Sequence, residues 1–174
     1  MKIARVSSSK RGETDRLLSD IAAKLQTGGH QLAGIIKEQS YAGQAANGCD
    51  MKVRVLPTGP VIQITQDLGT GSDACRLDPG ALTEAVCCVE GGPLERVDLF
   101  ILNKFGPEES AGRGFCSVIA AALEQDIPVL VGVGLASSDS FDAFAGELAE
   151  ALPDEADAIL TWCQAAIKRG SLAA

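Results

Sequence analysis

The first segment that could do chemistry is Ser7–Thr14, which lies between an apolar run and a helix-like run. Its place and spacing resemble the phosphate-binding loop pattern G-x-x-x-x-G-K-[ST]. Gly12 and Thr14 match this pattern, but Ser7 replaces the first glycine and Glu13 replaces the lysine. The helix N-terminus and the serine hydroxyls still offer donors to an anion. We expect an anion-binding loop here, with an ordinary strand-to-helix turn as the alternative; the binding residues would be Ser7, Ser8, Ser9, Lys10, Arg11, Gly12 and Thr14.

The second such segment, Asp98–Gly114, begins as a continuous apolar run and ends in polar residues. Phosphate-hydrolysing enzymes of the phosphate-binding-loop class place a magnesium-binding Asp at the end of such a strand. Asn103 stands at that position here, and Lys104 follows it. The pair also matches the start of the guanine-reading motif N-K-x-D, but Gly106 replaces its Asp, which argues against guanine recognition. The candidates for catalysis are Lys104, Glu108 and Glu109, and those for binding are Asn103 and Arg113.

Lysine at position 104 favours an anion over a cation at this site. The cations of the two segments and of a third loop could together hold a nucleotide phosphate or a tetrahedral oxyanion through charge-assisted hydrogen bonds; they are Lys10, Arg11, Arg76, Lys104 and Arg113. Glu13 opposes such binding, and in the competing interpretation a pair such as Lys104 with Glu13 simply neutralises the site.

The elements that must position these segments alternate between strands and helices. Apolar patterning predicts strands at 2–7, 31–37, 98–103 and 127–133, and helices at 14–26, 78–89, 112–125, 138–152 and 154–169. A β-hairpin is expected over about residues 51–66, because Pro57-Thr58-Gly59-Pro60 joins two β-rich runs. This order predicts one α/β domain over residues 1–174 with a mostly parallel sheet. Ligands bind such sheets beyond the carboxyl ends of the strands. We therefore expect the loops at 7–14, 103–114 and 133–138 to form the site.

Composition narrows the classes of partner. The chain has 174 residues, a net charge of −8 and 46% hydrophobic residues, which is enough for a substantial core. The negative charge argues against nucleic-acid binding, which needs clustered cations. The sequence contains neither an apolar run long enough to span a membrane nor an N-terminal signal-like stretch, so we expect no membrane partner and a cytoplasmic location.

The six cysteines do not form a metal-binding pattern, since no C-x-x-C pair is present and His30 is the only histidine. Cys87, Cys88, Cys116 and Cys163 lie in apolar helix-like stretches and are expected to be reduced and buried. Cys49 and Cys75 lie in glycine- and aspartate-rich loops, and their role is left open.

Several stretches resemble a bacterial family classed as domain of unknown function 2478; they include Asn-Lys-Phe-Gly at 103–106, Gly-Arg-Gly-Phe at 112–115, Ile-Pro-Val-Leu at 127–130, Gln-Asp-Leu-Gly at 66–69 and Cys-Arg-Leu-Asp-Pro at 75–79. That family is similar to small nucleoside-triphosphatases whose second motif is D-E-[IV]-G-x-M-E, onto which residues 103–109 align. The resemblance implies a three-layer sandwich like that of the P-loop nucleoside-triphosphatases. It also implies a molybdenum link, because members are often encoded beside molybdate-transport genes.

These observations predict a degenerate P-loop-like protein that binds a nucleotide or oxyanion in molybdenum metabolism. The candidate ligands are ATP or GTP with Mg²⁺, and molybdate or tungstate. The partner is a small anion, no metal-ligand residues are assigned, and homo-oligomerisation is left open. Two alternatives remain, a weak nucleoside triphosphatase and an interaction module with a vestigial site. Whether the chain is an enzyme stays open, because the loop lysine and the strand-end aspartate are both absent.

Overall fold

A mixed sheet forms the centre of the protein. The structure, a computed structural model, describes residues 2–39, 51–66 and 76–170. Within this part of the chain, seven strands form one sheet in the order β4-β3-β2-β7-β8-β1-β9, and β5 pairs with β6 separately. The strands are β1 (Ile3–Val6), β2 (Leu32–Lys37), β3 (Lys52–Val55), β4 (Val61–Gln63), β5 (Thr65–Gln66), β6 (Arg76–Leu77), β7 (Leu99–Phe105), β8 (Val129–Val133) and β9 (Ala149–Leu152).

Five neighbouring strands of this sheet run parallel, and the hairpin adds two antiparallel pairings at one edge. β1 pairs in parallel with both β8 and β9, and β7 pairs in parallel with both β8 and β2. β3 is antiparallel to β2 and to β4, so the expected hairpin extends the sheet beyond β2. The predicted α/β sandwich with a mostly parallel sheet and an inserted hairpin is confirmed.

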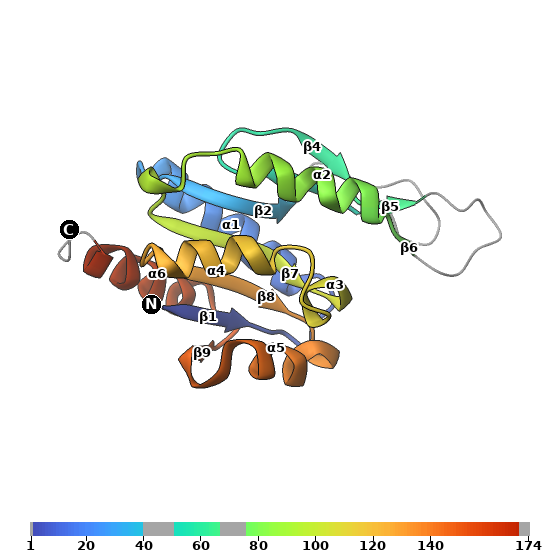
Figure 1. Ribbon diagram of the computed structural model, residues 1–174. Coiled ribbons are helices and arrows are strands. Elements are labelled where there is room, and N and C mark those ends of the chain that lie inside the picture. The colour runs from blue at the N-terminus through green and yellow to red at the C-terminus, as the bar shows by residue number, and fades with distance from the viewer. Residues whose placement is uncertain (1, 40–50, 67–75, 171–174) are drawn as a thin grey trace.

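Helices cover both faces of the sheet (Figure 1). One layer contains α1 (Glu13–Thr27) and α6 (Ala156–Gly170), and the other contains α2 (Pro79–Glu90), α4 (Cys116–Glu124) and α5 (Ser138–Ala145). Each layer packs an apolar face on the strands, for example Leu18 and Ile21 of α1 and Ile119 of α4, all fully buried. Because the helix after β1 and the elements after β7 and β8 go to opposite faces, a crevice opens at the carboxyl ends of these strands.

One predicted helix is wrong in its second half. Residues 138–152 are expected to be helical, but α5 ends at Ala145 and residues 149–152 form β9 at the edge of the sheet. Gly146 has a φ of 59°, which breaks the helix, and a short 3₁₀ turn, η3 (Gly146–Leu148), follows. The run Ala-Glu-Ala-Leu has helical propensity, but its backbone pairs with β1. A non-local pairing therefore overrides local preference here.

Two further expectations need correction. The helix expected over 112–125 begins only at Cys116, so Arg113 lies before it, while residues 107–110 form a short helix, α3 (Pro107–Ser110), within the expected loop. Cys87 and Cys88 are exposed on α2 and Cys116 is half-buried, so burial is correct only for Cys163. Cys49 and Cys75 lie outside the described residues.

Candidate functional site

The two candidate segments meet in one cavity at the carboxyl edge of the parallel strands. This carboxyl-edge cavity has a volume of about 230 Å³. The loop between β1 and α1 forms one wall, and the ends of β7 and β8 form the other; the lining residues are Ser8, Ser9, Lys10, Arg11, Gly12, Thr14, Asp15, Asn103, Lys104, Gly132, Val133 and Gly134. The expected proximity of the two segments is thereby confirmed. Sequence alone identified this edge, including the start of the loop after β8 at Val133 and Gly134.

The loop after β1 is held in shape by its own hydroxyl groups. The Ser8 amide donates to Thr14 Oγ1 at 3.2 Å, and the Lys10 amide donates to Ser8 Oγ at 3.1 Å. Ser8 Oγ in turn donates to Asp154 at 2.7 Å, which ties the loop to the segment before α6. Gly12 has a φ of 76°, a conformation that favours glycine, at the turn into α1. No side chain caps the start of α1 within the described residues, and Gly12 and Thr14 at this end line the cavity. The amides of the first turn are therefore candidate donors to an anion.

Glu13 does not face the cavity. Its carboxylate accepts two hydrogen bonds from Arg16, at 2.6 and 2.9 Å, and Arg16 also pairs with Asp20 at 2.6 Å. The hydrogen bond from Arg16 lowers the pKa of Glu13, so this group is charged and paired on the surface of α1. Glu13 is not among the lining residues, and its partner is Arg16 rather than Lys104. The main objection to anion binding, repulsion by Glu13, is therefore reduced.

Asp15 contributes the one carboxylate that lines the cavity among the described residues, and two neighbours engage it. Lys37 Nζ lies 3.0 Å from Asp15 Oδ2, and Asn103 Nδ2 donates to Asp15 Oδ1 at 3.0 Å. Asn103 is buried, and its Oδ1 accepts from the Lys37 amide at 2.9 Å. The strand-end position that holds a metal-binding carboxylate in phosphate-hydrolysing enzymes thus carries an amide that binds Asp15 and Lys37.

These residues do not fit a magnesium ion. Mg²⁺ prefers carboxylate oxygens in near-octahedral geometry, whereas Asp15 is bonded to an ammonium and an amide on its two oxygens. In the described ranges, no three His, Cys, Asp or Glu side chains gather closely enough to hold a metal ion. No part of the chemistry below is therefore derived through a metal.

Lys104 is aimed at the cavity by an irregularity in β7. Leu102 pairs with Val131 and Phe105 pairs with Val133, so three residues of β7 advance against two of β8. Such a bulge redirects a side chain; Lys104 is exposed, whereas Asn103 and Phe105 on either side of it are buried. A Cβ on Gly132 would collide with the Asn103 carbonyl oxygen, so glycine permits this close approach of the two strands. Lys104 lies beside Gly134 and forms no ion pair with any described residue.

The segment after β7 is organised by Glu109. This residue is 5% exposed, and its carboxylate accepts from the Gly106 amide at 3.0 Å and from the Phe115 amide at 3.1 Å. Gly114 leaves room for the carboxylate, since a Cβ there would collide with Glu109 Oε1. Glu109 therefore holds both ends of the segment between β7 and α4, and neither of its oxygens is free.

Glu108 and Arg113 pair with each other outside the carboxyl-edge cavity. Arg113 donates to Glu108 at 2.7 and 3.1 Å, and this bonding lowers the pKa of the carboxyl and raises that of the guanidinium. Glu108 and Glu109 instead line a second, apolar cavity of about 350 Å³, which shares Asn103 and Lys104 with the first. Ser7, the first residue of the loop after β1, does not line the carboxyl-edge cavity, and its hydroxyl is buried without a partner among the described residues. The side chain of Arg76 lies outside the described residues.

The residues missed by sequence reasoning are Asp15, Lys37, Asp154 and Gly132, whereas Val133 and Gly134 belong to the predicted loop at 133–138. Asp15 directly follows Thr14, and Lys37 ends a predicted strand. Both residues could therefore have been proposed as site candidates from the sequence. Their pairing depends on the neighbouring positions of β2, β7 and α1, which the one-dimensional pattern does not contain.

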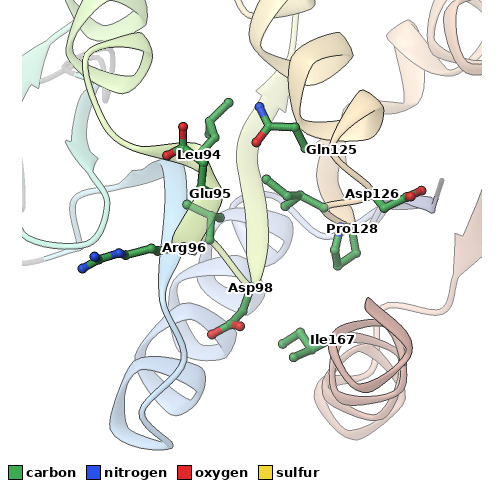
Figure 2. Close-up of a pocket in the computed structure, with 10 residues that line it drawn as sticks. Leu94, Glu95, Arg96, Asp98, Gln125, Asp126, Pro128 and Ile167 are labelled. Atoms are coloured by element: carbon green, nitrogen blue, oxygen red, sulfur yellow. The ribbon is translucent and has the colours of Figure 1, made fainter. Parts of the chain in front are cut away.

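Another cavity, of about 330 Å³, lies near the amino end of β7 (Figure 2). The segment before β7, the turn after α4 and Ile167 of α6 surround it. Its Asp98 carboxylate accepts from the Gln31 amide at 2.8 Å and lies 3.6 Å from His30 Nδ1. Because ligands of parallel sheets bind at the carboxyl edge, we place the functional site in the smaller carboxyl-edge cavity.

The strand–loop–helix arrangement at the carboxyl edge of this sheet makes the protein a P-loop nucleoside-triphosphatase-like α/β sandwich. The chain belongs to the family described as Protein of unknown function (DUF2478), whose model matches residues 3–162.

A curated relative is the molybdenum import ATP-binding protein ModC 2 of Bradyrhizobium diazoefficiens, with 32% identity over 163 residues. The match covers 92% of this chain but only 18% of that relative. No solved structure matches. None of the described helices is long and apolar enough to cross a membrane.

Proposed function

We propose that this chain binds a small oxyanion, either the phosphate of a nucleotide or molybdate or tungstate, in the carboxyl-edge cavity. The observation that carries the proposal is the charge balance of that cavity. Lys10, Arg11 and Lys104 line it without an ion pair to any described residue, whereas its carboxylate, Asp15, is paired with Lys37. Unpaired cations beside an uncapped helix N-terminus favour an anion through charge-assisted hydrogen bonds.

The roles of individual residues follow from their positions. Lys104 would be the anchor, because the bulge in β7 directs it to the cavity; Lys10 and Arg11 would add charge from the facing loop. Ser8 and Thr14 shape the loop, and Gly12 allows its turn. Asn103 would keep Asp15 and Lys37 in place rather than contact the anion. Arg113 does not line the cavity and is paired with Glu108, so it has no role in this binding.

The relative supports the choice of ligands to test, because its name joins molybdenum import with ATP binding. A molybdenum-related role for this chain is therefore part of the proposal. We further propose that nucleotide turnover is far below the usual enzyme range of about 1 to 1,000 per second. The phosphate-binding loop lacks its lysine, and both carboxylate oxygens of Asp15 are bonded to Lys37 and Asn103. Neither group is therefore available to assist hydrolysis.

Calorimetric titration of the full chain tests the proposal, with ATP, GTP, molybdate, tungstate and phosphate, each with and without Mg²⁺. We expect at least one anion to bind, with an affinity that Mg²⁺ does not increase. If none of the five ligands binds, the result would contradict the proposal and favour the interaction module. Slow nucleotide hydrolysis that is lost in Thr14→Ala would favour the weak nucleoside triphosphatase instead, with Thr14, Lys104 and Glu108 or Glu109 in catalysis. Hydrolysis at ordinary rates would contradict the degenerate site.

A further inference from the structure

The apolar cavity adjoins the carboxyl-edge cavity at the end of β7. Both are lined by Asn103 and Lys104, the residues that end β7. The apolar cavity, at about 350 Å³, is the larger of the two and within the range typical of small-molecule sites. An anion bound near Lys104 would therefore have an adjoining space for whatever group it carries.

The walls of this adjoining space are suited to a hydrophobic group. They are formed mainly by side chains of the hydrophobic core, including Val53, Ile64, Leu77, Leu82, Leu102 and Phe115. Met51 and Leu77 are only half-buried, although they pack against buried neighbours. Apolar surface left accessible beside a charged anchor is a typical arrangement of a small-molecule site, in which a few polar groups fix the orientation.

The charged groups of the apolar cavity do not favour a cationic ligand. Glu109 accepts from two backbone amides, and Glu108 is paired with Arg113. Lys104 is exposed and shared with the first cavity, and it forms no ion pair with the described residues. The two cavities together thus offer an unpaired cation at their junction and apolar walls on one side of it.

From this arrangement we infer that the ligand is an organic phosphate monoester with an aromatic or heteroaromatic ring. The phosphate lies in the carboxyl-edge cavity against Lys104, and the ring lies in the apolar cavity beside Met51 and Leu77. This inference rests on the proposed anion binding and specifies the class of ligand. It involves binding only, with no bond made or broken.

Methyl phosphate and 1-naphthyl phosphate test the inference, since both carry a phosphate monoester and only one carries a ring. In calorimetry on the full chain, we expect 1-naphthyl phosphate to bind at least about tenfold more tightly, because its ring leaves water for apolar walls. Met51→Trp should fill the apolar cavity and remove this difference while keeping the affinity for methyl phosphate. Leu148→Trp is the matched control, because Leu148 is 53% exposed and lines neither cavity.

An NMR measurement on the unmodified chain does not depend on the folding of a variant. Ring protons of 1-naphthyl phosphate should show nuclear Overhauser contacts to the Met51 methyl group. Equal affinities for the two esters, or a difference that survives in a folded Met51→Trp protein, would overturn the inference while leaving anion binding intact. If neither ester binds, and phosphate and molybdate also fail to bind, the proposed function itself is wrong.

Discussion

The Lys37 ammonium lies 3.0 Å from the Asp15 carboxylate and pairs with the one acidic side chain that lines the carboxyl-edge cavity among the described residues. Asn103 supports the pair from β7, by donating to Asp15 and accepting from the Lys37 backbone. The pair joins α1 to the end of β2, and it is partly exposed, so its effect on stability is small. Its larger effect concerns charge, because it offsets a carboxylate that would otherwise repel an anion.

Lys37→Met should therefore weaken anion binding by about tenfold, since the released Asp15 charge acts on the ligand over a short distance. Calorimetric titration with phosphate and molybdate measures the change. The double variant Lys37→Met with Asp15→Asn is the control and should recover most of the affinity. Unchanged binding in folded Lys37→Met would show that Asp15 does not act on the ligand.

Glu109→Gln should destabilise the protein by about 1–3 kcal/mol, because an amide replaces one of two carboxylate oxygens that accept from buried backbone N–H groups. Urea unfolding followed by circular dichroism measures this loss. Glu108→Gln is the matched control, since Glu108 pairs with Arg113 at the surface and its loss should barely change the urea midpoint. Equal effects of the two changes would contradict the structural role of Glu109.

The thiols should differ in reactivity according to their exposure. Cys87 and Cys88 are exposed on α2 and should react with iodoacetamide in the folded protein, whereas Cys163 is fully buried and should react only after unfolding. Burial also raises the pKa of the half-buried Cys116 thiol, so it should react more slowly than Cys87. Peptide mapping by mass spectrometry assigns each site. Rapid labelling of Cys163 under native conditions would contradict its position between α6 and the sheet.

Because the Cys163 thiol is buried, the free energy of unfolding should also depend on pH. Burial raises its pKa to about 12, whereas the unfolded thiol ionises near 9.0. Above pH 9 the unfolded state therefore loses a proton that the folded state keeps, and the free energy of unfolding falls as pH rises towards 12. The slope from this group is about 1.4 kcal/mol per pH unit.

Chemical denaturation at pH 8 and pH 10 measures that slope, with Cys163→Ala as the comparison. The variant should lose less stability between the two pH values than the unmodified chain. Equal losses would show that the Cys163 thiol is not responsible.

Much of the fold follows from local patterns in the sequence. The continuous apolar runs at 98–103 and 127–133 predict strands with both faces covered, and these became β7 and β8 at the centre of the sheet. Strand β9 was missed because Ala149–Leu152 has helical composition and becomes a strand only by pairing with β1. Likewise, α3 was missed because a helix of four residues has too few positions for periodicity to detect.

In the candidate site, too, some features follow from local sequence and others depend on contacts between distant residues. The polar loop after β1 and the Asn103-Lys104 pair are visible in sequence as polar residues after apolar strands. Their alignment in one cavity follows from the parallel sheet. The partners of the acidic residues do not follow, since Glu13 bonds to Arg16 one turn along α1 while Asp15 bonds to Lys37 of β2. Glu13 and Asp15 are only two residues apart, but they have different partners because α1 directs Glu13 outward and Asp15 toward the sheet.

Lys104→Ala tests the central claim most directly, that Lys104 anchors an anion in the carboxyl-edge cavity. Lys24→Ala is the matched control, since it removes the same charge from an exposed position in the last turn of α1. In calorimetric titrations with phosphate and molybdate, we expect Lys104→Ala to weaken binding by about tenfold to a hundredfold, and Lys24→Ala to change it little. Both variants should keep the melting temperature of the ligand-free chain, because Lys104 is exposed and forms no ion pair with the described residues. Unchanged affinity in Lys104→Ala, or an equal loss in Lys24→Ala, would contradict the account.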